Sequence, residues 1–181
     1  MPIVTATQTA DQRLNEYCVG LAGSTCTYPG IGQCFAIAGW LPSGMVCAHV
    51  SPGSTAGDID AFFAEFRRLG GDQAVAWYVV GPFTDHFAVA KAQWRSVRHI
   101  RKAFDAGLGR TNTAQRWIAD VGPERNTKVL EPGFTIPRTF NSIDIRAEHR
   151  GFTSMVVFSW KESSPRAKDW TRLPLSRFVR F

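Results

Sequence analysis

A cysteine and a histidine lie in two apolar runs that follow each other closely in the chain. Cys34 comes directly after the glycine-rich stretch Gly30–Gln33, and His49 lies near the end of the second run, Met45–Val50. A short turn at Pro42–Gly44 joins the runs, so we expect them to pair as a β-hairpin. An imidazole beside a thiol can accept its proton and return it to a leaving group. The pattern therefore predicts nucleophilic catalysis by Cys34, with His49 as the base.

The residues just before the cysteine have a predicted role of their own. Gly32 allows a sharp turn, and backbone N–H groups in a turn formed by Gly32 and Gln33 could stabilise an oxyanion. Two alternatives stay open. Cysteine is often only a buried packing residue, and Cys47, on the same strand face as His49, could be the nucleophile instead.

The composition is typical of a folded globular protein. The chain has 181 residues, of which 44% are hydrophobic and 20% charged, and we expect residues 1–181 to form a single catalytic domain. Residues 1–14 are polar and predict a flexible leader, without the pattern of a standard signal peptide. The sequence contains no apolar stretch close to the roughly 20 residues that span a bilayer.

The remaining pattern predicts helices that flank a sheet. A strand is expected at 74–80, a helix begins near Asp58, and a longer helix is expected over 85–106. Further strands are expected at 142–147 and 154–160. The first helix carries one apolar stripe, which consists of Ile59, Phe62, Phe63, Phe66 and Leu69. Short connections favour antiparallel pairing, so the predicted class is α/β (α+β), a mostly antiparallel β-sandwich core flanked by helices.

Charge and cysteine spacing bear on partners and cofactors. The net charge is +6, which favours an acidic partner. Four basic residues at helical spacing could dock an acidic protein or form a solvated face: Lys91, Arg95, Arg98 and Lys102. We expect a protein substrate, a monomer, and no nucleic acid, because no nucleic-acid-binding signature is present. The cysteines lack paired metal-ligand spacing, so neither a metal nor a cofactor is expected, and a Cys18–Cys26 disulfide would require export.

The order of these features resembles a known family. Gly-x-Gly-Gln-Cys, an apolar strand, a short turn, an apolar strand ending in His49, a proline-containing loop and an amphipathic helix occur in this order in the chemoreceptor glutamine deamidase (CheD) family. The catalytic domains of the cytotoxic necrotizing factor toxins and of the Burkholderia lethal factor are similar. The resemblance covers about residues 25–81. It implies a β-sandwich on which Cys34 attacks a glutamine side chain of a target protein, ammonia leaves, and water hydrolyses the thioester to glutamate.

The resemblance also implies a biological setting and a third catalytic group. It suggests a bacterial toxin or effector, delivered by a dedicated secretion system, and otherwise a cytoplasmic protein. Where the family has a threonine upstream of the cysteine, this chain has Tyr28, so Thr27 is the candidate third group and Thr25 the reserve. A cysteine peptidase, an amidase, a transglutaminase and a non-enzymatic basic binding module remain as alternatives.

Overall fold

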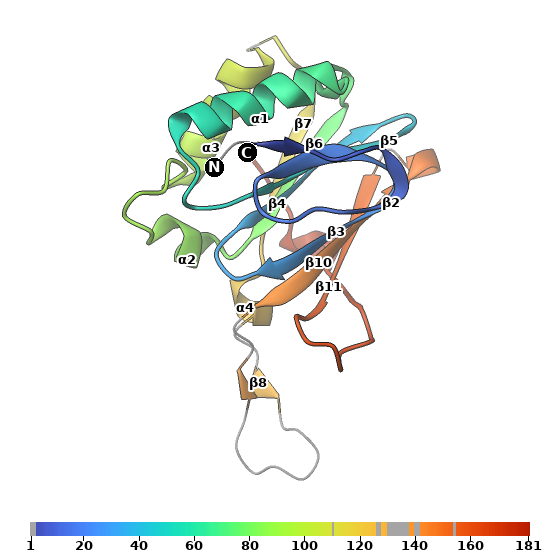
Figure 1. Ribbon diagram of the computed structural model, residues 1–181, viewed down its shortest axis with the longest axis vertical. Coiled ribbons are helices and arrows are strands. Elements are labelled where there is room, and N and C mark those ends of the chain that lie inside the picture. Colours follow the sequence, from blue (N-terminus) through green and yellow to red (C-terminus); the bar gives the residue numbers. More distant parts are fainter. Residues whose placement is uncertain (1–2, 110, 126–127, 130–137, 140–141, 154) are drawn as a thin grey trace.

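The protein is a mixed α/β structure dominated by a curled β-sheet (Figure 1). The computed structural model describes residues 3–109, 111–125, 128–129, 138–139, 142–153 and 155–181. Across these residues, the main sheet has the strand order β12-β11-β10-β3-β5-β4-β6-β7-β13, and β1 and β2 pair with β3. The strands are β1 (Val4–Thr5), β2 (Thr9–Arg13), β3 (Cys18–Ile31), β4 (Phe35–Leu41), β5 (Gly44–Val50), β6 (Ala76–Gly81), β7 (Gln115–Asp120), β10 (Ile143–Arg150), β11 (Met155–Glu162), β12 (Thr171–Arg172) and β13 (Val179–Arg180). The short strands β8 (Lys128–Val129) and β9 (Arg138–Thr139) pair with each other.

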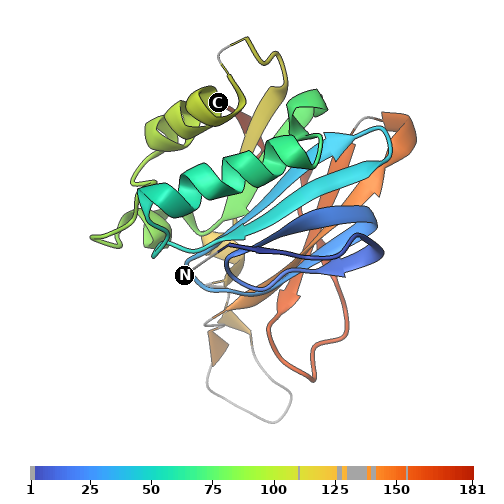
Figure 2. The same cartoon turned by 45° about the horizontal axis from the view of Figure 1, so that its top comes forward.

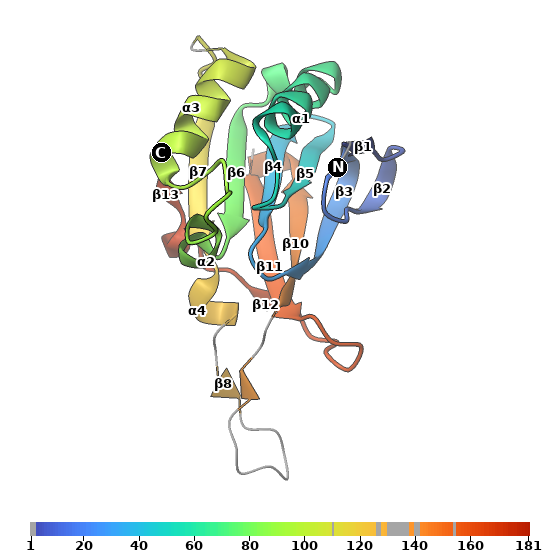
Figure 3. The same cartoon turned by 60° about the vertical axis from the view of Figure 1, so that its left-hand side comes forward.

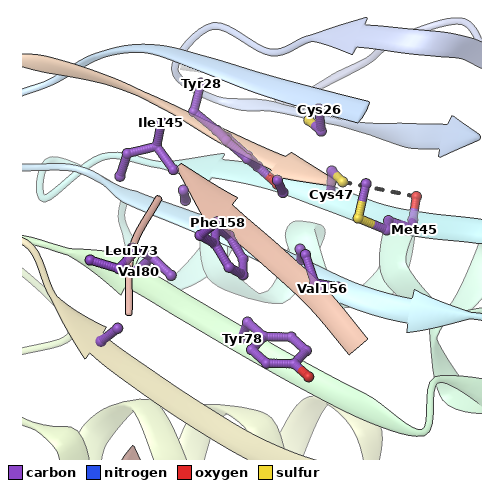
Figure 4. Packing of buried hydrophobic residues seen from close by; sticks show 14 of the residues in the cluster. Cys26, Tyr28, Met45, Cys47, Tyr78, Val80, Ile145, Val156, Phe158 and Leu173 are labelled. Atoms are coloured by element: carbon purple, nitrogen blue, oxygen red, sulfur yellow. Dashed lines mark hydrogen bonds between the residues drawn. The ribbon is translucent and has the colours of Figure 1, made fainter. Parts of the chain in front are cut away.

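The sheet curls because the long strand β3 belongs to both of its halves. The first part of β3 pairs antiparallel with β5, with Val19 opposite Ala48, and the second part pairs antiparallel with β10, with Cys26 opposite Ala147. Strand β11 then lies over β6, so that the rings of Phe158 and Tyr78 have centroids 5.7 Å apart (Figure 4). The space between the halves is filled by an apolar core.

A second core lies on the other face of the sheet, beneath two helices (Figure 2). Helix α1 (Ala56–Arg68) buries the predicted stripe residues Ile59, Phe62, Phe63 and Phe66. Helix α3 (Val97–Leu108) adds Ile100 and Phe104, and Trp77 of β6 packs against both Phe66 and Phe104. Two shorter α-helices are α2 (Phe83–Phe87) and α4 (Gly122–Arg125).

The predicted hairpin and the first helix are present, and the helix begins slightly before Asp58. Strands β4 and β5 pair antiparallel through a tight turn in which Leu41 lies opposite Gly44. Helix α1 is capped by Thr55. Asp58 completes a capping box, because its side chain accepts a hydrogen bond from the Thr55 backbone while its own N–H is bound by the Thr55 hydroxyl.

The prediction of one long helix over residues 85–106 is wrong. The chain forms α2, an irregular segment and then α3, which begins after Ser96, whose side chain accepts a hydrogen bond from the N–H of His99. Within the irregular segment, the Arg95 guanidinium donates to the carbonyls of Ala90 and Ala92. The carbonyls of Ala90 and Ala92 thus accept hydrogen bonds from a side chain, and the next helix begins only after its cap residue Ser96.

Strand β7 and the N-terminal strands were not predicted. Strand β7 pairs parallel to β6, with Ile118 beside Val79, which the helical crossover between the two strands permits. Residues expected to form a flexible leader contain β1 and β2, which both pair parallel to β3, and Leu14 after them is fully buried. Figure 3 shows these strands beside β3 at one side of the sheet.

Candidate active site

The hairpin brings Cys34 and His49 to the same face of the sheet. His49 of β5 lies opposite Ala36 of β4, and Cys34 comes two residues before Ala36. Because side chains alternate between faces, residues two apart on a strand share a face, and Cys34 lies diagonal to His49. Strands β4 and β5 run side by side at the centre of the sheet (Figure 3). The structure therefore places the predicted thiol and imidazole together.

The group that joins this pair is Glu16. The Cys34 thiol donates a hydrogen bond to Oε1 of Glu16, with a sulfur–oxygen distance of 3.1 Å. One potential ligand atom from each of Glu16, Cys34 and His49 lies within 4.8 Å of the others. Glu16 was not predicted, because it follows a polar segment whose residues give no sign of pairing with the sheet.

The predicted third group, Thr27, occupies a different position. Tyr28 packs edge-on against the His49 ring, with centroids 6.2 Å apart, so its neighbour Thr27 faces the opposite side of β3. The Thr27 backbone carbonyl accepts a hydrogen bond from the Leu14 N–H at 2.9 Å. Thr27 therefore supports the site through its main chain, because Leu14 in turn contacts the histidine. The reserve, Thr25, donates its hydroxyl to Asp11.

The protonation of His49 is fixed by its surroundings. The Nδ1 atom lies 3.0 Å from the Leu14 carbonyl oxygen, which can only accept, so Nδ1 carries the proton and Nε2 keeps the lone pair. Burial lowers the pKa of His49, although the Leu14 carbonyl and the negative charge of Glu16 partly oppose this. His49 is only 1% exposed, and its Nε2 has no hydrogen-bond partner. The resting imidazole is thus neutral, with a basic nitrogen available.

The Cys34 thiol is held in its protonated form. Burial raises its pKa well above the ordinary value, and the hydrogen bond and negative charge of Glu16 raise it further. Hydrogen bonds involving the Ser51 side chain and the Gln33 backbone lower the pKa of Cys34, but they are the smaller effects. The resting site therefore consists of a thiol, a neutral imidazole and a nearby carboxylate, and not of a thiolate–imidazolium pair.

A second histidine holds the turn before the cysteine. The His86 ring stacks on Phe35, with centroids 3.8 Å apart, and its Nδ1 donates to the Gln33 carbonyl at 2.6 Å. Burial lowers the pKa of His86 to about 4, so it is neutral at pH 7. Because the Gln33–Cys34 peptide is trans, the Cys34 N–H points away from His86. That N–H is the best-defined candidate oxyanion donor of the predicted Gly32-Gln33 turn.

Two unusual backbone features surround the candidate residues. The left-handed glycine in the stretch before Cys34 is Gly30, with φ of 68°, and not Gly32. Tyr17, next to Glu16, also has a positive φ, 63°, which is uncommon for a residue with a large side chain. The Tyr17 N–H donates to the backbone carbonyl of His49. Strain of this kind concentrates at functional sites, where surrounding contacts maintain it.

Access to the site is from the side of Glu16. Cys34 is only 4% exposed, whereas the Glu16 side chain faces solvent. A surface concavity of about 490 Å³ borders this carboxylate and is lined by Arg13, Asn15, Glu16, Tyr17, Pro29, Gly30 and Ser163. Cys34 and His49 do not line this concavity, and Glu16 lies between it and the thiol.

The other predicted functional residues lie elsewhere. Cys47 is fully buried between the sheet halves, near Tyr28 and Cys26 (Figure 4), and all four cysteines are free. The basic residues do not share one helix, because Lys91 and Arg95 lie in the irregular segment and only Arg98 and Lys102 belong to α3. Their docking role stays a prediction.

An apolar cavity of about 580 Å³ lies at the other end of β6. Its lining residues are Val75, Ala76, Tyr78, Gln115, Trp117, Thr153, Met155, Leu175 and Phe178. Ala76 pairs with Trp40, at the end of β4 that is remote from Cys34. This cavity therefore does not form part of the candidate active site.

Comparisons with known proteins give no match: neither a family model, nor a curated protein, nor a solved structure matches this chain. Among the helices in the described part of the chain, none combines the length and apolarity needed to cross a bilayer.

Proposed function

We propose that the protein is a cysteine hydrolase that converts a glutamine side chain of a target protein to glutamate. The observation that carries this proposal is the thiol of Cys34, the neutral imidazole of His49 and the carboxylate of Glu16 within 4.8 Å of one another. A nucleophile, a base and a group that stabilises the charged base are the parts that acyl transfer requires. No metal or cofactor is needed for this chemistry.

The reaction would begin when an incoming carboxamide displaces Glu16 from the thiol. The Cys34 proton passes to Nε2 of His49, and sulfur attacks the carboxamide carbon. The carboxylate of Glu16 raises the pKa of His49 by charge attraction, and this stabilises the imidazolium that forms. The oxyanion is stabilised by the Cys34 N–H, whose direction His86 holds.

The remaining steps return every group to its starting state. The imidazolium gives its proton to the leaving nitrogen, and ammonia departs to leave a thioester on Cys34. His49 then takes a proton from water, and the hydroxide attacks the thioester carbonyl. Collapse of this second intermediate releases the glutamate carboxyl, and sulfur recovers its proton from His49.

The choice of substrate rests on access, charge and resemblance. A thiol that is 4% exposed suits a slender side chain better than a folded backbone. The net charge of +6 favours an acidic target. The resemblance to the chemoreceptor deamidases and the related toxins favours glutamine in a protein, and it extends the proposal to an effector role. A deamidase-like β-sandwich fold forms part of the same proposal.

The test is ammonia release from benzyloxycarbonyl-Gln-Gly and from casein, an acidic protein rich in glutamine. We expect a mass increase of about one dalton per modified glutamine, because an amide becomes an acid. Cys34→Ala should abolish the release while circular dichroism stays unchanged, and Cys18→Ala, which alters a half-buried free thiol elsewhere, should retain it. Release that persists in Cys34→Ala contradicts the proposal. Peptide cleavage without ammonia, or incorporation of a primary amine, would instead indicate a peptidase or a transglutaminase.

A further inference from the structure

The three groups of the candidate active site are also a set of metal ligands. Zn²⁺ in proteins prefers thiolate, imidazole and carboxylate ligands in a tetrahedral arrangement. Here the Glu16 oxygen and the Cys34 sulfur are already 3.1 Å apart, and one imidazole nitrogen of His49 completes a cluster within 4.8 Å. In a tetrahedral zinc site, ligand atoms lie about 3.5 Å apart, given bonds of about 2.0–2.3 Å.

An independent observation at His49 points to a ligand. Its Nε2 is buried without a hydrogen-bond partner, and the residue as a whole is only 1% exposed. Its Nδ1 meanwhile binds the Leu14 carbonyl. A histidine that ligates a metal through one nitrogen commonly donates the other N–H to a backbone carbonyl, which fixes the ring and its tautomer.

The required movement is small, and the exposed Glu16 side chain can take up part of it. Cys34 and His49 are anchored by the β4–β5 hairpin, whereas the Glu16 side chain faces solvent and can rotate to complete the site. With a thiolate and a carboxylate, a divalent ion gives a neutral cluster, and the Cys34 proton is released to water. Three protein ligands leave the fourth position open.

We propose that Glu16, Cys34 and His49 bind one Zn²⁺ reversibly, and that the bound ion switches off the thiol chemistry. Binding depends only on the ligand geometry, whereas the inhibition rests on the proposed function. The ion would occupy both the nucleophile and the base, so zinc-bound protein would neither be alkylated at Cys34 nor hydrolyse a carboxamide.

Cobalt substitution tests binding without any assay of activity. Co²⁺ bound by a thiolate gives an intense near-ultraviolet charge-transfer band, and we expect this band to saturate at one equivalent per chain and to be displaced by Zn²⁺. Cys34→Ser should abolish the band, and Glu16→Gln, at an exposed position that should not disturb folding, should weaken Co²⁺ affinity at least tenfold. The matched controls Cys18→Ser and His99→Gln should bind as the unaltered protein does. A missing band, or one that survives in Cys34→Ser, overturns the proposal.

A second readout separates this inference from the proposed function. Equimolar Zn²⁺ should slow iodoacetamide alkylation of Cys34 at least tenfold, and it should leave alkylation of Cys18 unchanged. If the band and the protection appear in a protein that releases no ammonia, the zinc site stands and the hydrolase fails. If ammonia is released but neither signal appears, the zinc site fails and the hydrolase stands.

Discussion

Replacement of Glu16 by glutamine should make the Cys34 thiol more reactive. The Glu16 carboxylate lies 3.1 Å from the sulfur and raises the pKa of Cys34, both through its hydrogen bond and through its charge. Glutamine keeps the shape of the side chain but removes the charge. At 3.1 Å, a thiolate and a carboxylate repel by about 1.3 kcal/mol even in a water-like dielectric. This value is a lower limit, since Cys34 is largely buried.

The loss of that repulsion should raise the ratio of thiolate to thiol about tenfold. A less basic thiolate is also a weaker nucleophile, with a Brønsted coefficient of about 0.4–0.5, so the rate of alkylation should rise about threefold. The assay measures iodoacetamide alkylation of Cys34 by peptide mass spectrometry across a range of pH. The exposed substitution Asp60→Asn on α1 serves as the control for net charge.

The shape of the pH profile decides the outcome. We expect the midpoint of the Glu16→Gln profile to move to lower pH. An unchanged midpoint would refute the electrostatic reasoning, even if the limiting rate rose, because a faster limiting rate alone reports easier access. A midpoint that moves to higher pH would show that the carboxylate favours the thiolate.

Three further predictions concern stability. Burial lowers the pKa of His86 to about 4 from its usual 6.5. Between these two pH values, His86 is therefore mostly neutral in the native state and mostly protonated in the unfolded chain. Stability should therefore fall as the pH drops from about 6.5 towards 4, by up to about 3 kcal/mol. His86→Gln should reduce this loss in urea unfolding at pH 7 and pH 4.5, and an equal loss in both proteins would contradict the assignment. A Cβ on Gly81 would lie 2.6 Å from the Cys34 carbonyl oxygen, so Gly81→Ala should cost about 1–3 kcal/mol by urea unfolding, whereas Gly57→Ala, where a Cβ meets only ordinary contact, should not. Thr55→Ala removes the cap of α1 and should cost about 1 kcal/mol by the same measurement; a change below about 0.3 kcal/mol would mean that the cap contributes little.

The parts of the fold that were predictable are those specified by neighbours in sequence. The hairpin follows from two apolar runs and one turn, and the proximity of Cys34 and His49 follows from the hairpin. The apolar stripe of α1 likewise depends only on local spacing.

The parts that escaped prediction depend on long-range pairing. Strand β7 was not predicted as a buried strand because its inward residue Arg116 is charged. The ion pair of Arg116 with Asp105 and its position over the Phe104 ring compensate for this burial. The prediction that Lys91, Arg95, Arg98 and Lys102 share one helix was wrong, because the spacing of charges alone does not specify a helix. Glu16 could not be assigned because its contact with Cys34 requires the parallel pairing of β2 with β3, which no local pattern signals.

The segment that links β2 to β3 holds two parts of the candidate site at once. It supplies both the Leu14 carbonyl that orients His49 and the carboxylate of Glu16. Local opening of this segment would separate these groups from Cys34 and would also expose Leu14, which packs in the core between the sheet halves. The Leu14 amide, which is bonded to the Thr27 carbonyl, would exchange with deuterium only during such openings. Its exchange rate thus reports how often the groups of the candidate site come apart.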